Sequence, residues 1–267
     1  MTRIDEYRVI LPTLADWDAY LMAESGLPGP RGNLELAQAV AELAAGADLE
    51  RWRGLTPQQA PVNSAGEYLA LCGVLGLRRG LLDGSAADRR ETLTALRAFA
   101  ADPRWRTREA AAMALQSWGA VHLEPMLAEM LSWAEGSPFE QRAAVAAIAE
   151  PAVLVQFGAK SGPSPTAAPL QGQVFDILDR ITTSFAAAAP PERRSEGWQA
   201  LKKGLAYGWS VAVAYLPQPG KPRIERWFTH PDRDVLWVMR ENLKKNRLER
   251  MDAEWTKQWK EKMGIIS

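Results

Sequence analysis

Apolar residues recur three or four positions apart through most of the chain, which is the spacing of one face of an α-helix. The clearest stripe consists of Val174, Ile177, Leu178, Ile181 and Phe185. Strict alternation of apolar and polar residues, which is typical of β-strands, is absent apart from short runs such as 211–213. The pattern therefore predicts an all-α protein with roughly ten to twelve helices.

Proline, glycine and capping residues divide this pattern into helices joined by tight turns. Asn33 follows a Gly/Pro-rich loop and is a predicted N-cap. Asp102-Pro103 ends one helix, because proline disfavours helical backbone in the residue before it, and the next helix is expected from about Trp105 to Trp118. A break is predicted over 217–222, and a later helix is expected over about 234–247.

Length and composition favour one folded domain over residues 1–267. The 267 residues are 47% hydrophobic, which is enough to bury a continuous core. The Gly-, Ser- and Pro-rich stretch at about 158–170 predicts a surface loop in that domain. With one cysteine, Cys72, an internal disulfide is excluded. The charged N-terminus and the lack of a long apolar run predict a soluble, cytoplasmic protein with no membrane segment.

Three segments that follow a turn containing proline look alike: Thr107–Ala112, Gln141–Ala146 and Asp234–Trp237. Arg108 and Arg142 occupy the same position in the first two, at a separation of 34 residues, whereas Leu236 stands there in the third. The Asp-Pro turn, the arginine and the small alanines resemble the HEAT repeat, and the third copy is degenerate. The resemblance implies an α-α superhelix, or solenoid, in which HEAT-like helical hairpins cover each other's apolar faces.

The chain also resembles a group of bacterial HEAT-repeat proteins, in the segments Leu27–Leu36 and Trp237–Lys245. That resemblance implies a fold but no mechanism.

A weaker resemblance is to the HEAT-like DNA glycosylases that remove alkylated purines, which use tryptophans and an aspartate near the damaged nucleotide. The chain has 11 tryptophans, and Asp232, Asp234 and Trp237 lie close together in its sequence. This resemblance makes these three residues candidates for a DNA site. The simpler interpretation is that the tryptophans beside apolar stripes form the core: Trp105, Trp198, Trp209, Trp227 and Trp237.

The 32 basic and 32 acidic residues balance, so a global attraction to nucleic acid is excluded and any electrostatic function is local. Residues 220–262 carry 12 Lys or Arg against 8 Asp or Glu. Within them Arg240, Lys244 and Arg247 are spaced to share one helical face. Such a face could follow a phosphate backbone, or it could be an ordinary solvated surface.

No catalytic residue is predicted, because the chain lacks a nucleophile elbow, a phosphate-binding loop and a zinc-protease motif. With His122 and His230 as its two histidines, it predicts no metal site, and no cofactor is expected. Cys72 lies in an apolar stretch and is interpreted as a buried thiol. Gly73, Gly76 and Gly80 are interpreted as helix-packing or capping glycines.

The functional hypothesis is a non-enzymatic binding or scaffold protein whose partner is another protein. The alternative is a DNA-binding or glycosylase-like protein. Candidate contact residues are the arginines and lysine of the repeat turns and the basic region: Arg104, Arg106, Arg108, Arg142, Arg240, Lys244 and Arg247. Arg108 and Arg142 have a structural alternative, in which they bond to turn carboxylates such as Asp102. No feature of the sequence specifies an oligomeric state.

Overall fold

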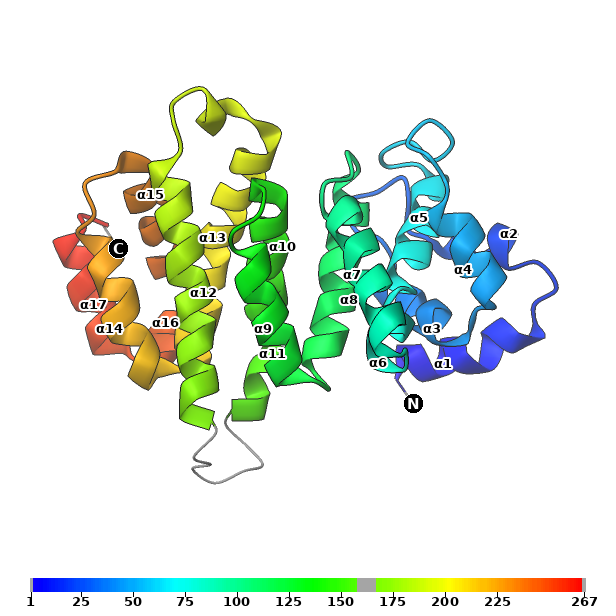
Figure 1. The fold of residues 1–267 in the computed structure, drawn as a ribbon, viewed down its shortest axis with the longest axis horizontal. Helices are drawn as coiled ribbons and strands as arrows, with labels where there is room; N and C mark the ends of the chain where they lie inside the picture. Colours follow the sequence, from blue (N-terminus) through cyan, green and yellow to red (C-terminus); the bar gives the residue numbers. More distant parts are fainter. Residues whose placement is uncertain (1, 158–166, 266–267) are drawn as a thin grey trace. The chain divides into compact units, whose positions relative to one another are not determined.

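The computed structural model describes residues 2–157 and 167–265, and every regular element in these ranges is helical. The helices are labelled in Figure 1. They form two compact units, Met1–Trp118 and Gly119–Ser267. The all-α class is thereby confirmed for the described residues. The single HEAT-like superhelix expected over residues 1–267 stays a prediction.

The first unit contains α1 (Arg3–Ile10), the 3-10 turn η1 (Leu11–Thr13), α2 (Trp17–Glu24), α3 (Leu34–Leu43), α4 (Gly46–Arg53), α5 (Ala65–Leu75), α6 (Arg78–Leu82), α7 (Ala86–Ala100) and α8 (Trp105–Gly119). The last residue of α8 is the first residue of the second unit. The central helix is α5, which contacts α2, α3 and α4. Its residues 67–75 are all buried, as expected for a helix that is surrounded by others. At Gly73 a Cβ atom would lie 2.3 Å from the backbone nitrogen of Arg53, so glycine permits the close packing of α5 on α4. The helix-packing interpretation of this glycine is confirmed.

The second unit contains α9 (Leu123–Trp133), α10 (Pro138–Ile148), α11 (Pro151–Leu154), η2 (Val155–Phe157), α12 (Ala167–Ala187), η3 (Glu192–Arg194), α13 (Glu196–Tyr215), α14 (Pro217–Phe228), α15 (Arg233–Leu243), α16 (Asn246–Met251) and α17 (Ala253–Lys262). Its central helix is α13, which contacts α10, α12, α14, α15 and α16 (Figure 1). The predicted stripe of α12 is buried in full. On α13, Trp198, Leu201, Leu205 and Trp209 are buried as well. Burial of these stripes supplies the hydrophobic free energy that holds the unit together.

Local side-chain hydrogen bonds define where several helices begin. Asn33 accepts a hydrogen bond of 3.1 Å from the backbone N–H three residues later, which confirms the predicted N-cap. Ser85 and Asp88 form reciprocal bonds at the start of α7, and Ser137 and Glu140 do the same at the start of α10. These capping boxes satisfy N–H groups that have no partner within the helix.

The predicted break over 217–222 is wrong, because these residues form the first half of α14. Pro217 is the first residue of the helix, where its missing N–H would have had no partner. Pro222 is the one proline inside the helix that costs a backbone hydrogen bond. Burial of Ile224 and Phe228 outweighs that cost.

The helix expected over 234–247 ends earlier, at Leu243. Lys245 has extended backbone, and a separate helix, α16, follows it. Leu243 and Leu248 are both fully buried. Five residues apart on one helix, they would point about 140° away from each other, and the break lets both reach the core.

The predicted loop at about 158–170 lies mostly outside the described residues. Positions 167–170 belong to α12, so the loop was predicted to extend too far.

The prediction of five core tryptophans is correct only in part. Trp198 and Trp209 are buried, and Trp227 is partly buried. Trp105 and Trp237 are 45% and 41% exposed, and each ring lies beneath a cationic side chain. A helical stripe gives the direction of a side chain but not whether a neighbouring helix covers it.

Candidate functional site

The turn before α8 is held by two of the predicted contact arginines. The Arg104 guanidinium donates to both carboxylate oxygens of Asp102, at 2.9 and 2.8 Å, and to the carbonyl of Leu55 at 2.9 Å. Arg108 donates to the carbonyls of Asp102 and Pro103 at 2.6 and 3.2 Å. Arg108 thus bonds to the turn that contains Asp102 through backbone carbonyls, while Arg104 is bonded to the Asp102 carboxylate.

Arg106 forms a buried ion pair with Glu67, at 3.1 Å between Nη1 and Oε2. Its Nη2 also donates to the Gly29 carbonyl at 2.6 Å. The carboxylate of Glu67 accepts a second bond, of 2.6 Å, from the backbone N–H of Asn63, which has a φ of 63°. This pair links α5 and α8 to two loops of the first unit.

The three arginines of this turn are therefore part of the folded core. Their residues are 2%, 4% and 9% exposed, in the order Arg104, Arg106 and Arg108. Such burial argues against the predicted contact role, since a partner could not reach the guanidinium groups. The fourth arginine, Arg142, is half-buried near the start of α10, where its Cγ approaches the position of a Cβ on Gly204 of α13.

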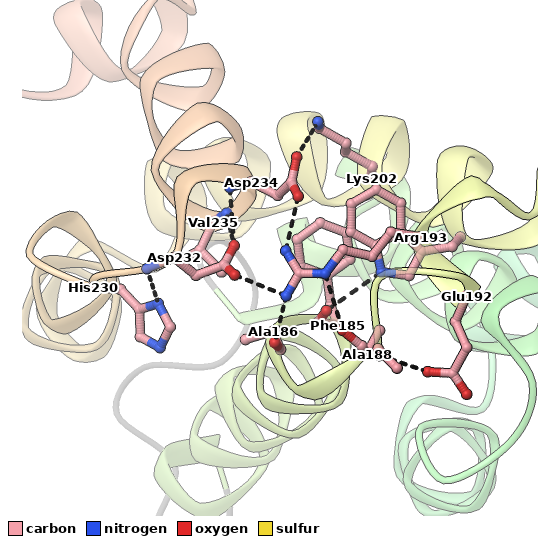
Figure 2. Close-up of polar contacts among 12 residues, drawn as sticks. Phe185, Ala186, Ala188, Glu192, Arg193, Lys202, His230, Asp232, Asp234 and Val235 are labelled. Carbon is pink, nitrogen blue, oxygen red and sulfur yellow. Dashed lines mark hydrogen bonds and ion pairs between the residues drawn. The ribbon is translucent and has the colours of Figure 1, made fainter.

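Figure 2 shows how the predicted DNA-site aspartates are arranged at the start of α15. Arg193 lies between them, with Nη2 2.8 Å from Asp232 and Nη1 2.8 Å from Asp234. The same guanidinium donates to the carbonyls of Ala186 and Ala188 at 2.9 Å each. Four bonds of one guanidinium group thus join the end of α12 to the start of α15.

Both aspartates accept bonds at each of their two carboxylate oxygens. Asp232 also accepts from the backbone N–H groups of Asp234 and Val235, at 2.9 and 3.1 Å, and is the N-cap of α15. Asp234 accepts from the Lys202 ammonium at 2.6 Å. Lys202 also lies 4.7 Å from the centre of the Trp237 ring. The arrangement neutralises two carboxylates and positions a helix, which is a structural role.

The electrostatics of this cluster agree with that role. Burial by itself would raise the pKa of Asp232 and of Asp234. The hydrogen bonds from Arg193, and for Asp234 first that from Lys202, outweigh burial and hold both pKa values below their usual range. A carboxylate with a depressed pKa is a poor general base near neutral pH. The sequence pattern placed Asp232, Asp234 and Trp237 together but missed Arg193 and Lys202, which come from a different turn and helix.

The basic residues at the junction of α15 and α16 surround a hollow of about 380 Å³, here called the basic hollow. It is lined by Lys244, Lys245, Asn246, Arg247 and Arg250. Lys244 pairs with Glu241 at 2.6 Å. Among the described residues, neither Lys245 nor Arg250 has an ion-pair partner. The basic hollow therefore presents four cations and an amide, with no carboxylate in its lining.

The predicted face of Arg240, Lys244 and Arg247 is divided by the break after α15. Lys244 and Arg247 line the basic hollow, whereas Arg240 donates to the carbonyl of Met263 at 3.3 Å and is outside the lining. The Arg247 guanidinium lies 4.4 Å from the centre of the Tyr207 ring, and Tyr207 is 42% exposed. Lys245 and Arg250 also line this site but are not on the predicted face, because the expected helix over 234–247 ran through the break at Lys245 and ended before Arg250.

The structure gives no support to a reactive thiol, a metal site or a membrane-spanning helix among the described residues. Cys72 is buried, as predicted, and burial raises the pKa of its thiol. Over the described ranges, His, Cys, Asp and Glu side chains form no group of three that could hold a metal ion. Within those same residues, no helix combines the length and apolar character needed to cross a bilayer. Of the predicted contact residues, Lys244 and Arg247 line the basic hollow.

Comparison with known proteins provides no further assignment: no protein-family model, curated protein or solved structure matches the chain.

Proposed function

We propose that this protein is a non-enzymatic binding protein that engages an acidic segment of another protein through the basic hollow. The observation that carries the proposal is the composition of the lining, with four cations, Lys244, Lys245, Arg247 and Arg250, and no carboxylate. In a chain whose total charge is zero, such a concentration of one sign is a local attraction for an anion. The HEAT-like scaffold expected from the repeats agrees with a binding role.

An acidic polypeptide matches the basic hollow better than duplex DNA does. Phosphate contacts along DNA require a row of cations, and affinity grows with the number of phosphates that are neutralised. Here the break between α15 and α16 gathers the cations around one hollow, and Arg240 lies outside it. The exposed ring of Tyr207 beside Arg247 offers an apolar contact to a side chain of the peptide.

The rest of the second unit supports a non-catalytic role. Asp232 and Asp234, the aspartates suggested by the glycosylase resemblance, are bonded to Arg193 and Lys202. A base-excising enzyme needs a carboxylate that can face the sugar or a water molecule. These two face cations and backbone N–H groups.

Fluorescence anisotropy with a labelled glutamate-rich peptide tests the proposal. We expect saturable binding that weakens as salt is added, because exposed charges are screened. The double variant Lys245→Glu/Arg250→Glu should lower the affinity at least about tenfold, since two attractions become repulsions. Arg90→Glu is the matched control, because Arg90 is exposed on α7 of the first unit. Binding that is equal in the double variant and the control would contradict the proposal.

Duplex DNA in the same assay tests the alternative function. We expect weaker binding than for the peptide at moderate salt. Tighter binding of DNA, with affinity that falls as a high power of the salt concentration, would replace the protein partner by nucleic acid. Release of free base from methylated DNA, abolished by Asp232→Asn, would establish a glycosylase and refute the non-enzymatic role.

A further inference from the structure

A second hollow, of about 370 Å³, lies on α12 and α14 and has a different character. It is lined by Asp179, Thr183, Arg223, Arg226, Trp227 and His230. No residue of this set belongs to the basic hollow. Its volume lies in the range of about 300–1,000 Å³ that is common for small-molecule sites.

The carboxylate of Asp179 organises this hollow. Its Oδ1 accepts from the indole N–H of Trp227 at 2.7 Å. Its Oδ2 accepts from Arg223 at 2.6 Å and from Arg226 at 2.8 Å. Because Asp179 orients two guanidinium groups and a flat indole ring at once, these side chains are positioned before any ligand arrives, which lowers the cost of binding.

The groups left without partners are donors. Arg226 uses Nη2 for Asp179, and no described residue accepts from its Nε or Nη1. Its side chain is 62% exposed. His230 accepts a bond of 3.2 Å from the Asp232 N–H at Nδ1, so in the neutral ring the proton lies on Nε2 and can be donated (Figure 2). Free donors on guanidinium and imidazole groups favour an oxyanion.

Charge and shape narrow the class of ligand. Arg223 is paired with two carboxylates, at 2.6 Å from Asp179 and 2.8 Å from Asp176. Arg226 keeps free donors, so the hollow suits a ligand with a single negative charge. The ring centroids of Trp227 and His230 lie 5.4 Å apart, and the two ring planes are inclined by 40°. The hollow is larger than a carboxylate group alone, and the indole face of Trp227 suits a flat apolar body. We propose that this hollow is a binding site for a small aromatic monocarboxylate, held through Arg226 and stacked on Trp227.

NMR titration of the full chain with benzoate tests this site. We expect the indole N–H signal of Trp227 to shift saturably, whereas benzyl alcohol, which has the ring but no charge, should bind at least about tenfold more weakly. Inorganic phosphate should compete poorly, because it carries more charge and has no flat body. Binding of phosphate that is tighter than that of benzoate would refute the monocarboxylate.

Arg226→Gln should weaken benzoate binding about tenfold or more, since it removes a charge-assisted hydrogen bond. Arg180→Gln is the control. Arg180, on α12, is exposed like Arg226, but it pairs with Glu135 and is outside the lining of the hollow. Equal affinity in the two variants, or no shift of the Trp227 signal at saturating benzoate, would overturn the proposal. The basic-hollow variant Lys245→Glu/Arg250→Glu should retain benzoate binding, so the two proposals can fail independently.

Discussion

The turn that begins α8 and the turn that precedes α16 are both rich in arginine or lysine, yet the structure uses them in opposite ways. At the first turn, Arg104, Arg106 and Arg108 are buried and bonded to acceptors of the chain itself. At the second, Lys245 and Arg250 line a hollow and have no ion-pair partner among the described residues. Both turns looked like contact surfaces in the sequence.

The comparison shows that nearby acceptors distinguish a structural arginine from a cation that stays in solvent. The presence of cations alone does not. Asp102, Glu67 and the carbonyls of nearby loops converge on the arginines of α8 and replace water as their partners. A buried cation without such acceptors would be too costly to keep. At α16, Glu241 pairs with Lys244 and Glu249 pairs with Lys260, which leaves Lys245 and Arg250 without an ion-pair partner among the described residues. The charges there stay in solvent and are available to a partner.

The largest expected effect concerns the buried pair of the first unit. Glu67→Ala should lower the free energy of unfolding by about 3–5 kcal/mol, because it leaves the Arg106 guanidinium buried without its counter-ion. Urea denaturation of the two proteins measures the change. Glu50→Ala is the control, since Glu50 is largely exposed in its pair with Arg53, and its effect should stay below about 1 kcal/mol. Similar small effects of both substitutions would remove the distinction drawn between the two turns.

A smaller effect is expected from Arg193 in the second unit. Arg193→Met should cost about 1–2 kcal/mol, because two aspartates and two carbonyls lose a shared donor but are reached by water in part. Denaturation in urea, followed by circular dichroism, gives the change. An unchanged midpoint would show that the cluster in Figure 2 does not hold α15.

The same cluster predicts how stability changes with pH. Because Asp232 and Asp234 have pKa values below their usual range in the folded protein, the unfolded chain binds protons at a higher pH than the folded one. Their contribution is complete above the unfolded value of about 3.9 and is lost as the pH falls through the lower folded values. Urea midpoints measured at pH 6 and at successively lower pH should fall less steeply in Asp234→Asn than in the unchanged protein. Parallel curves would contradict this.

The smallest effect on stability is expected at the basic hollow. Lys245→Glu/Arg250→Glu should change the free energy of unfolding by less than about 0.5 kcal/mol, as surface substitutions usually do, while peptide binding is lost. Thermal unfolding compares this variant with Arg90→Glu. A loss of more than about 1 kcal/mol would place these cations with the structural arginines of α8.

Much of the secondary structure could be predicted from the chain alone. The N-cap at Asn33, the helix that starts at Trp105 and the stripe of α12 are all present, because local hydrogen bonds and 3.6-residue periodicity are properties of neighbouring residues. The errors at Pro217 and Lys245 have a common cause. In both places the helix boundary follows the burial of particular side chains, which depends on helices far away in the sequence.

The candidate sites were predictable only as lists of residue types. The repeat pattern indicated Arg108, and the periodicity indicated Lys244, but neither showed which cations have acceptors nearby. Arg193 lies about 40 residues from the two aspartates that it joins, and Arg106 lies at a similar distance from Glu67. No spacing rule connects such residues, because the contact exists only after α12, α13 and α15, or α5 and α8, have packed.

The amino-acid sequence by itself determined that this protein is helical, where most of its helices begin, and that its basic and acidic residues balance overall. The tertiary structure decided which cations are structural and which face solvent. It also brought Arg226, Trp227 and His230 together around Asp179. The physical reason is range: helix propensity and capping act over a few residues, whereas burial and ion pairing depend on the partners that long-range packing supplies.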